Sequence, residues 1–511
     1  MRELVELTRV VNKNKIKRID LLDPRSNQQT RAAQLYNLLS NGVVASEEEA
    51  FSHFEAYEMS KSAFSNLKAS LRSKLLNTLF FIDTSQPSYN NRQSAYYHLQ
   101  KSMAAASILM AKQATRTAVT ELKKICKQAL QYEFTDLILF SARQLSLHYA
   151  IKEGALQKFS TYQQLVDVYS QVSHAEAIAE AAYCDLIVQY VNRKQNKTTL
   201  YDLALEKLDK LNAHDRTTDS YGFRLYYYLI ELFKFTCIND YAGALPTTVD
   251  MISYFRSKDY DAFTPIQIAL HHQMIGYLQV GNDDASLQAL LEGQSMLEVG
   301  SFNWFKNCEY QFLLAMHTGK YTKALESYVL VVNHVKFKNL PTNVREVWTI
   351  YHAYVQFLLV VGKAECPEGE EKHFTTFRIN RFINELPLYS KDKSGMNTAI
   401  IIAQILFYLQ KQKFDQVIDR IEAIEKYCSR YLVKSDLVRV YYFIKLLMIL
   451  PKAGFNRKRA TRYAERHYEK LQAYSLEKVR SFHKLEIIPF EKLWDITLEM
   501  LFDKAKEFRT K

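Results

Sequence analysis

The chain has 511 residues, of which 48% are hydrophobic, and its formal net charge at pH 7 is +12. That length suffices for about three ordinary domains or one long repeat array. Gly (13) and Pro (9) are both scarce, whereas β-proteins and dinucleotide-binding folds use glycine at many turns. The composition therefore predicts an all-α protein with long helices and short loops.

The positive charge lies at the two ends of the chain. Residues 1–150 carry a net charge of +7, residues 151–300 carry −7, and residues 301–511 carry +12. Basic ends favour acidic partners or nucleic acid, and the alternative is that these charges only solvate helix surfaces.

Nothing in the sequence indicates secretion or a membrane span. The six cysteines are dispersed and form no CxxC pair, so we expect reduced, mostly buried thiols in a bacterial protein of the cytoplasm. The first ten residues lack the apolar stretch of a signal peptide. The longest near-apolar run, 399–409, is shorter than the ~20 residues that span a bilayer.

Residues 1–90 are expected to form a basic N-terminal helical block. Its first part holds the basic segment 13–18 and a break at 23–30. A helix is expected to stop at Asn41-Gly42, and Ser46 with Glu49 forms a capping-box pattern that opens the next one. An amphipathic helix is expected over 62–81, and Pro87 ends the block. The polar face of that helix carries Lys61, Lys68, Arg72 and Lys74.

The rest of the chain predicts a repeat block over 91–435 and capping helices over 436–511. The expected helices begin with 94–113, 115–131, 136–151, 160–193, 200–211, 221–238 and 245–256. We expect 160–193 to be two helices, because its apolar pattern weakens at 170–174.

One stretch, 314–331, predicts a helical hairpin most clearly. An apolar helix runs into a turn at Gly319-Lys320-Tyr321, and Ala324 and Tyr328 then share one face of a second helix. Gly relieves the backbone at such a turn, and a small residue lets the two helices approach closely. Weaker versions turn at Asn239-Asp240-Tyr241, at Gly281-Asn282-Asp283 and at Gln412-Lys413-Phe414. Gly362 is a candidate turn for an irregular unit between the turns at Gly319 and Gln412. Hairpins of this kind must stack to bury their faces.

This unit, through Gly319, Tyr321, Ala324 and Tyr328, resembles the tetratricopeptide family of helical repeats. The resemblance covers about residues 220–430 and implies an irregular α-solenoid. The early Trp and closing Pro of the family are absent, and the spacing between units exceeds the family's 34 residues. The N-terminal block also resembles the start of uncharacterised proteins from Bacteroidetes-type bacteria, which implies no function.

The resemblance also implies a partner-binding face, because the family binds partners on the inner face of each first helix. Carried over by position, that face holds Tyr226, Phe233, His271, Gln279, Lys306, Glu309 and His317. In the last unit the same positions are Ala399, Ile402 and Leu406, which we expect to be buried. The Lys/Asn set by which some family members clamp a C-terminal carboxylate is not present.

We find no catalytic or cofactor motif in the sequence. Thr318-Gly319-Lys320 lacks the earlier glycine of a phosphate-binding loop, and neither HExxH nor GxSxG occurs. One loop holds Cys366, Glu370 and His373, for which a solvated acidic loop is the alternative to a metal site. We therefore expect neither cofactor nor metal.

The strongest charge cluster lies in the C-terminal block. Its basic members are Arg457, Lys458, Arg459, Arg462 and Arg466, interleaved with Tyr463, Tyr468 and Tyr474. Arginine with aromatic rings suits phosphates and unpaired bases, and the alternative is a terminal helix whose cations face solvent while its tyrosines pack inward.

The sequence thus favours a non-enzymatic scaffold or regulator that binds a protein or peptide on helical repeats. A nucleic-acid-associated protein that uses its basic N- and C-terminal helices is the first alternative. An enzyme with a site dispersed over the solenoid is the second.

Overall fold

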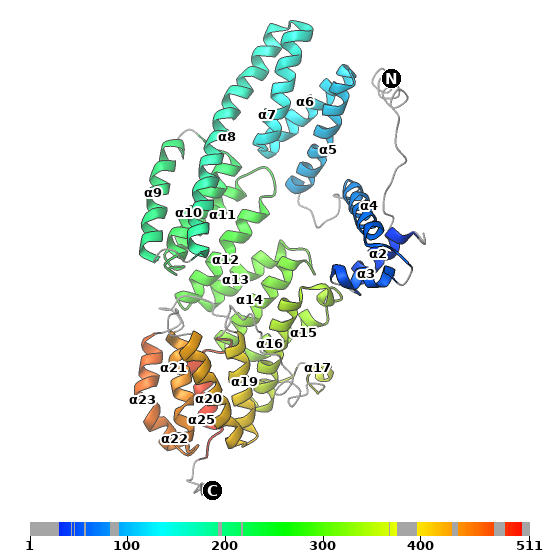
Figure 1. The fold of residues 1–511 in the computed structure, drawn as a ribbon. Coiled ribbons are helices and arrows are strands. Elements are labelled where there is room, and N and C mark those ends of the chain that lie inside the picture. The colour runs from blue at the N-terminus through cyan, green and yellow to red at the C-terminus, as the bar shows by residue number, and fades with distance from the viewer. Residues whose placement is uncertain are drawn as a thin grey trace. The chain divides into compact units, whose positions relative to one another are not determined.

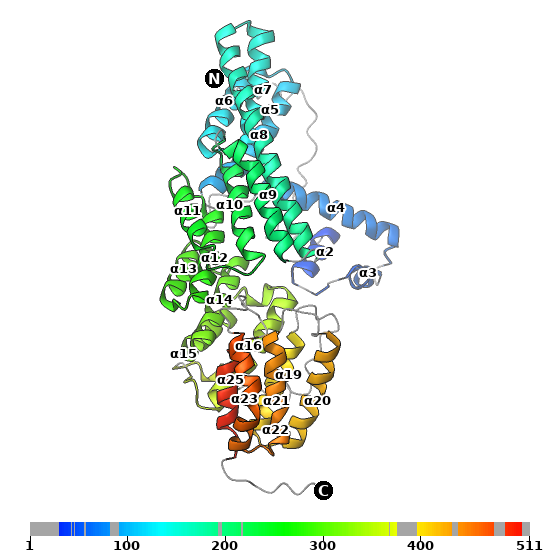
Figure 2. The ribbon, with the colours of Figure 1, turned by 90° about the vertical axis from the view of Figure 1, so that its left-hand side faces the viewer.

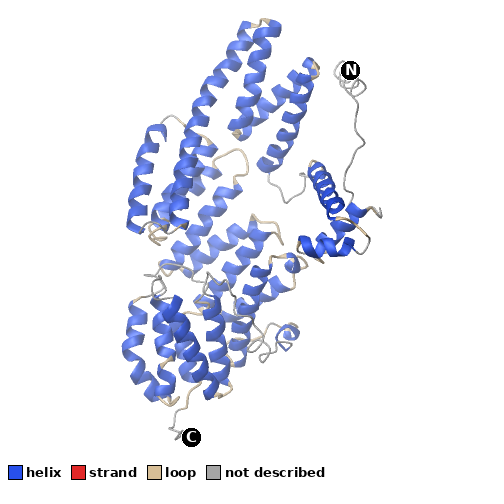
Figure 3. Cartoon of the chain, viewed as in Figure 1, coloured by secondary structure: helices blue, strands red, loops and turns tan. Residues whose placement is uncertain are grey.

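A computed structural model describes residues 30–81 (without 42, 45, 56 and 57), 91–192, 197–215, 218–366, 368–375, 396–431, 438–474 and 486–502. These residues form helices and no strand (Figures 1 and 3). The all-α prediction is confirmed for this part of the chain. The basic segment 13–18, the break at 23–29 and Pro87 lie outside it.

By its contacts the chain divides into two compact units. The first comprises residues 1–175 and 259–261, and the second comprises 176–258 and 262–511. The block boundaries expected near 90 and 435 stay predictions. Helices of the first unit are α2 (Arg31–Ser40), α3 (Glu47–Glu55), α4 (Lys61–Leu79), α5 (Asn91–Ala111), α6 (Thr115–Tyr132), α7 (Thr135–His148), the π-turn η1 (Tyr149–Glu153) and the start of α8 (Leu156–Val191).

The described residues of the first unit contain three apolar clusters. One lies within α2–α4, a second joins α5, α6 and α7 and the start of α8, and a small third one lies at the junction of α5 and α6. The capping box that opens α3 is confirmed: Glu49 N–H donates to Ser46 Oγ (3.1 Å), and Ser46 N–H donates to Glu49 Oε2 (3.3 Å).

The second unit begins within α8 and continues as a series of helices that contact their neighbours in sequence. They are α9 (Lys197–Asp215), α10 (Tyr221–Thr236), α11 (Leu245–Arg256), α12 (Phe263–Gln279), α13 (Asp283–Ser295), α14 (Phe302–Thr318), α15 (Tyr321–Val332), the 3-10 turn η2 (Phe337–Asn339), α16 (Thr342–Val360), α17 (Glu371–Thr375), α19 (Met396–Gln410), α20 (Phe414–Tyr431), α21 (Val438–Leu447), α22 (Ile449–Lys452), α23 (Arg457–Ala473) and α25 (Phe490–Glu499).

Helix α8 differs from its prediction, because residues 156–191 form one helix rather than two. The segment 170–174 holds Ser, Gln, Val, Ser and His, which weaken the apolar pattern. It contains neither Gly nor Pro, so nothing interrupts the backbone hydrogen bonds of the helix.

All five predicted hairpin turns share one backbone geometry. Their key residues have positive φ: Asn239 (60°), Gly281 (73°), Gly319 (78°), Gly362 (68°) and Gln412 (52°). In each turn the next amide N–H donates back to a carbonyl five residues earlier, as Lys320 N–H does to Ala315 O (2.9 Å). This left-handed C-cap ends one helix, and after Gly281, Gly319 and Gln412 the next helix begins two residues later.

We expect Gln412→Gly to stabilise the protein. A residue with a Cβ pays about 1–2 kcal/mol in the left-handed region, and part of the gain is offset by the greater freedom of glycine in the unfolded chain. The free energy of unfolding in urea should rise by about 0.5–1 kcal/mol. The matched change Gly319→Ala should lower it, because φ there is +78° and a Cβ would lie 3.1 Å from Lys492 Nζ. A loss of stability in Gln412→Gly would show that the turn is not strained.

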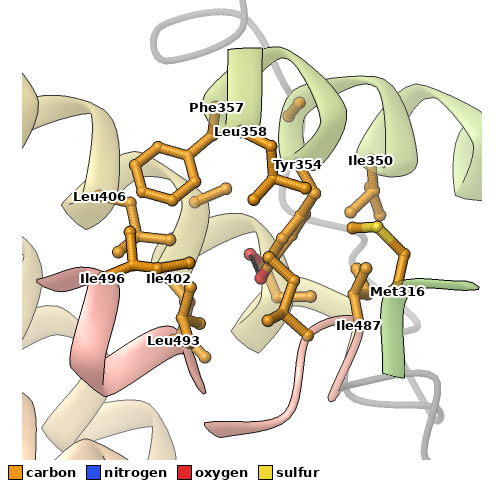
Figure 4. Close-up of a cluster of buried hydrophobic side chains, with 14 of the residues drawn as sticks. Met316, Ile350, Tyr354, Phe357, Leu358, Ile402, Leu406, Ile487, Leu493 and Ile496 are labelled. Carbon is orange, nitrogen blue, oxygen red and sulfur yellow. Dashed lines mark hydrogen bonds between the residues drawn. The ribbon is translucent and has the colours of Figure 1, made fainter. Parts of the chain in front are cut away.

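The helices at the C-terminal end of the second unit enclose an extensive apolar core. Tyr354 and Phe357 of α16 meet Ile402 and Leu406 of α19, together with Ile496 of α25 (Figure 4). The hydroxyl of Tyr354 donates to Ala399 O at 2.9 Å, which satisfies the polar atom of a fully buried ring.

A buried arginine joins three segments beside this core. Arg439 of α21 is 2% exposed, and its guanidinium pairs with Glu486 (2.6 Å), which is 1% exposed, and with Glu491 of α25 (2.6 Å). It also donates to Leu471 O (3.2 Å) and Tyr474 O (2.7 Å) at the end of α23. Figure 2 shows α21, α23 and α25 side by side. Arg439 therefore fixes the C-terminus of α23 against α21.

None of the helices in the described ranges is both long enough and apolar enough to cross a membrane.

Candidate functional site

A groove of about 360 Å³ opens between three consecutive helices of the second unit, α12, α13 and α14. Its polar lining comes from Gln267 and His271 of α12 and from Lys306, Asn307 and Tyr310 of α14, and Leu290 and Gly293 of α13 form its floor. A volume of this size lies in the range of pockets that bind ligands or single side chains.

The groove carries little net charge at neutral pH. Burial, with a smaller effect from Lys306, lowers the pKa of His271 to about 4, so its imidazole is neutral at pH 7. The ring of His271 lies 4.5 Å from that of Tyr310. The ammonium of Lys306 is paired with Glu309, one turn further along α14. An uncharged ligand segment therefore suits the groove better than a strongly ionic one.

Asn307, which lines this groove, has a buried amide oxygen without a hydrogen-bond partner among the described residues. Its Nδ2 lies 3.4 Å from Leu290 O. A buried acceptor without a partner costs about 1–3 kcal/mol, which a ligand N–H would recover. Asn307 and Tyr310 were not among the predicted partner-binding residues, because the superposition of the hairpins on their turns assigned only Lys306, Glu309 and His317 of this helix to the partner-binding face.

Two of the seven predicted partner-binding residues, His271 and Lys306, line the groove together. Two others, Tyr226 and Gln279, form hydrogen bonds with neighbouring segments of the second unit. The hydroxyl of the half-buried Tyr226 donates to Glu180 of α8 (3.0 Å), and its pKa is raised to about 12 by burial and by this contact. The side chain of Gln279 clamps the preceding turn, since Nε2 donates to Asn239 O (3.2 Å) and Oε1 accepts from Ala242 N–H (3.0 Å).

The expected exposure of the other three residues is wrong, because Phe233, Glu309 and His317 are buried. Phe233 packs edge-on against Tyr190 of α8, and Glu309 accepts from the Tyr351 hydroxyl (3.2 Å). His317 Nε2 lies 2.7 Å from Glu486 O. Helix α14 is covered by α13, by α15 and by the segment 486–489, which the hairpin pattern does not include. The expected burial of Ala399, Ile402 and Leu406 is confirmed.

A second candidate surface lies on α23. Its predicted cations Arg457, Lys458, Arg459, Arg462 and Arg466 are all exposed. No carboxylate of the described residues forms an ion pair with them. Tyr463 and Tyr474 are 47% and 43% exposed, so the alternative in which the tyrosines pack inward does not hold for these two. Tyr468 is half-buried and packs against the core.

The N-terminal basic stripe is less continuous than α23. Lys68 is paired with Glu47, and Lys68 and Arg72 border an apolar groove of about 770 Å³ among α2, α3 and α4. Leu39, Leu76 and Leu79 beside this groove are exposed. The pairing with Glu47 reduces the charge that this stripe offers to a phosphate backbone.

Of the three candidate ligands in the acidic loop after α16, the side chain of His373 lies outside the described part of the chain. No group of three His, Cys, Asp or Glu side chains capable of holding a metal occurs in the ranges that the structure describes. Cys366 is half-buried, and Asn333 Nδ2 lies 3.4 Å from Glu370 Oε2. The cysteines described elsewhere are buried, except for the exposed Cys184.

Comparison with known proteins gives no family model, no curated protein and no solved structure that matches this chain.

Proposed function

We propose that the protein is a non-enzymatic scaffold or regulator that binds a protein or peptide on an irregular α-solenoid. The groove between α12, α13 and α14 carries this proposal, because it lies where the repeat alignment puts a partner-binding face. Its neutral imidazole and its unpartnered Asn307 acceptor suit a peptide backbone, which offers N–H and C=O groups without charge. The shared C-cap of successive hairpins supports the solenoid architecture.

A single substitution at Gly293, which lines the groove, can fill it. Gly293 is buried, and a Cβ there would lie 3.6 Å from Asn307 Nδ2 and 3.9 Å from Leu270 Cβ, which is ordinary contact. Gly293→Ala should therefore fold, and it gains helix propensity of about 1 kcal/mol. Gly293→Leu extends three more carbon atoms toward the groove and should fill it.

We expect peptides selected on the wild-type protein from a random displayed library to lose binding in Gly293→Leu. Affinity should fall at least about tenfold, since the blocked groove excludes the peptide, and Gly293→Ala should bind like wild type. Both affinities are measured by fluorescence anisotropy, with circular dichroism to show that each variant is folded. A selection that enriches no peptide, or enriched peptides that bind Gly293→Leu unchanged, would overturn the proposal.

A second function is supported by a separate observation, the five exposed cations on α23 that pair with no described carboxylate. We propose nucleic-acid binding at this helix as the alternative. Unpaired arginines release counterions from a phosphate backbone, so affinity should fall steeply with salt. An affinity for oligonucleotides that does not change across a salt series would contradict it.

A further inference from the structure

Three cations and two tyrosines of α23 and its C-cap form an exposed stripe. Arg459, Tyr463, Arg466, Lys470 and Tyr474 follow one another at intervals of three or four residues, the spacing that places side chains on one face of a helix. At 1.5 Å per residue the stripe is about 22 Å long. The acidic residues of this helix border the stripe, because Glu469 lies three residues after Arg466 and Glu465 lies three residues after Arg462.

Helix α21 adds further rings and cations beside the end of this stripe. Tyr442 stacks on Tyr474, with ring centroids 5.9 Å apart and planes inclined by 22°. Lys470 Nζ lies 5.8 Å from the centre of the Tyr442 ring. Next to Tyr442, Tyr441 is 44% exposed and has Lys445 Nζ 5.5 Å from its ring centre. The stripe thereby widens into a surface that belongs to two helices.

His467 lies among several of the positive charges of this surface, and they affect its pKa. Burial lowers its pKa, and the charges of Lys470, Lys445, Arg466 and Lys452 lower it further. Its buried Nδ1 has no hydrogen-bond partner among the described residues. A negatively charged or acceptor-rich ligand would therefore be favoured beside this ring.

The position of Tyr474 is fixed by the buried network described above. Arg439 lies one turn before Tyr442 on α21 and donates to the carbonyls of Leu471 and Tyr474. The backbone at the end of α23 is thus held while the Tyr474 ring remains 43% exposed. A ring that is held in place and still accessible loses little entropy when a planar ligand stacks on it.

We propose that this cation–tyrosine surface of α21 and α23 binds single-stranded nucleic acid, with the exposed rings of Tyr463 and Tyr474 as stacking platforms for bases and with Arg459, Arg466 and Lys470 at the phosphates. The inference rests on the nucleic-acid function proposed above and specifies its substrate class. Bases in a duplex are already stacked on one another, so exposed aromatic rings of a protein add stacking only to single strands. The stripe is long enough to contact several nucleotides.

The test measures anisotropy of a fluorescent oligothymidylate of about 12 nucleotides, within the site sizes typical of single-strand binding. The full-length protein is compared with Tyr474→Ala, Tyr474→Phe and the double variant Arg459→Gln, Arg466→Gln. Tyr190→Ala on α8 changes a tyrosine of similar exposure (45%) outside the surface and is the control. A duplex of the same length and inorganic polyphosphate are measured as competitors.

We expect Tyr474→Ala to weaken single-strand binding at least about fivefold, while Tyr474→Phe and Tyr190→Ala bind like wild type. The double arginine variant should bind weakly and should reduce the slope of log affinity against log salt by about 1.4. The duplex and polyphosphate should compete poorly, because neither offers unpaired bases.

Two results would overturn the inference in distinguishable ways. If the duplex or polyphosphate competes as well as the single strand and Tyr474→Ala has no effect, the surface is a general polyanion site and base stacking is wrong. If no nucleic acid binds at low salt, the nucleic-acid function itself is wrong.

Discussion

Arg439→Met should destabilise the second unit by about 3–5 kcal/mol, because it leaves the carboxylate of Glu486 buried without its partner. The pKa of Glu486 is already raised by burial, and Arg439 is the main group that opposes this effect. The substitution also removes donors from the carbonyls of Leu471 and Tyr474. The free energy of unfolding measured in urea checks the magnitude.

A second variant separates the buried charge from the loss of packing. The double change Arg439→Met, Glu486→Gln removes both charges of the pair and should recover at least half of the loss, because breaking a buried pair costs more than replacing it. Arg116→Met, at an exposed position on α6, should change stability by less than about 0.5 kcal/mol. A loss in Arg439→Met as small as that of Arg116→Met would show that the network contributes little.

Acidification should destabilise the protein through His317. Burial lowers its pKa from 6.5 to about 4, with contributions in the same direction from Arg439 and Lys492; the contact with Glu486 O and the charge of Glu491 act in the opposite direction. The unfolded chain takes up a proton near pH 6.5, but the folded chain does so only near pH 4. Stability is therefore lost as pH falls through this window, by about 3 kcal/mol for this residue.

The contribution of His317 can be isolated by His317→Gln, which keeps a donor toward Glu486 O and does not titrate. The difference in free energy of unfolding between wild type and variant should shift in favour of the variant by about 3 kcal/mol as pH is lowered from 6.5 to 4. Other titrating groups, including Glu486, are common to both chains and cancel to first order. A difference that stays constant with pH would mean that His317 is protonated in the folded protein.

Local features of the sequence were enough to predict the turns and the all-helical character of the described residues, although α8 is one helix and not the expected two. Few glycines and prolines predict long helices, and the capping box at Ser46 and the turns at Gly281 and Gly319 depend on backbone groups within a few residues. Periodicity along α23 likewise indicates its exposed cations, because one face of that helix carries Ala460, Ala464 and Leu471. Interactions of this range need no information from distant parts of the chain.

The tertiary structure decided which faces are covered. The tetratricopeptide resemblance implied that Glu309 and His317 lie on an open face, but the segment 486–489 and Tyr351 of α16, both distant in sequence, bury them. The same holds for the two candidate surfaces: the groove needs α13 to bring Gly293 beneath Asn307, and the stacking surface needs α21 to bring Tyr442 against Tyr474. Periodicity identifies the face of one helix, whereas the burial of that face depends on contacts between residues that the sequence alone does not pair.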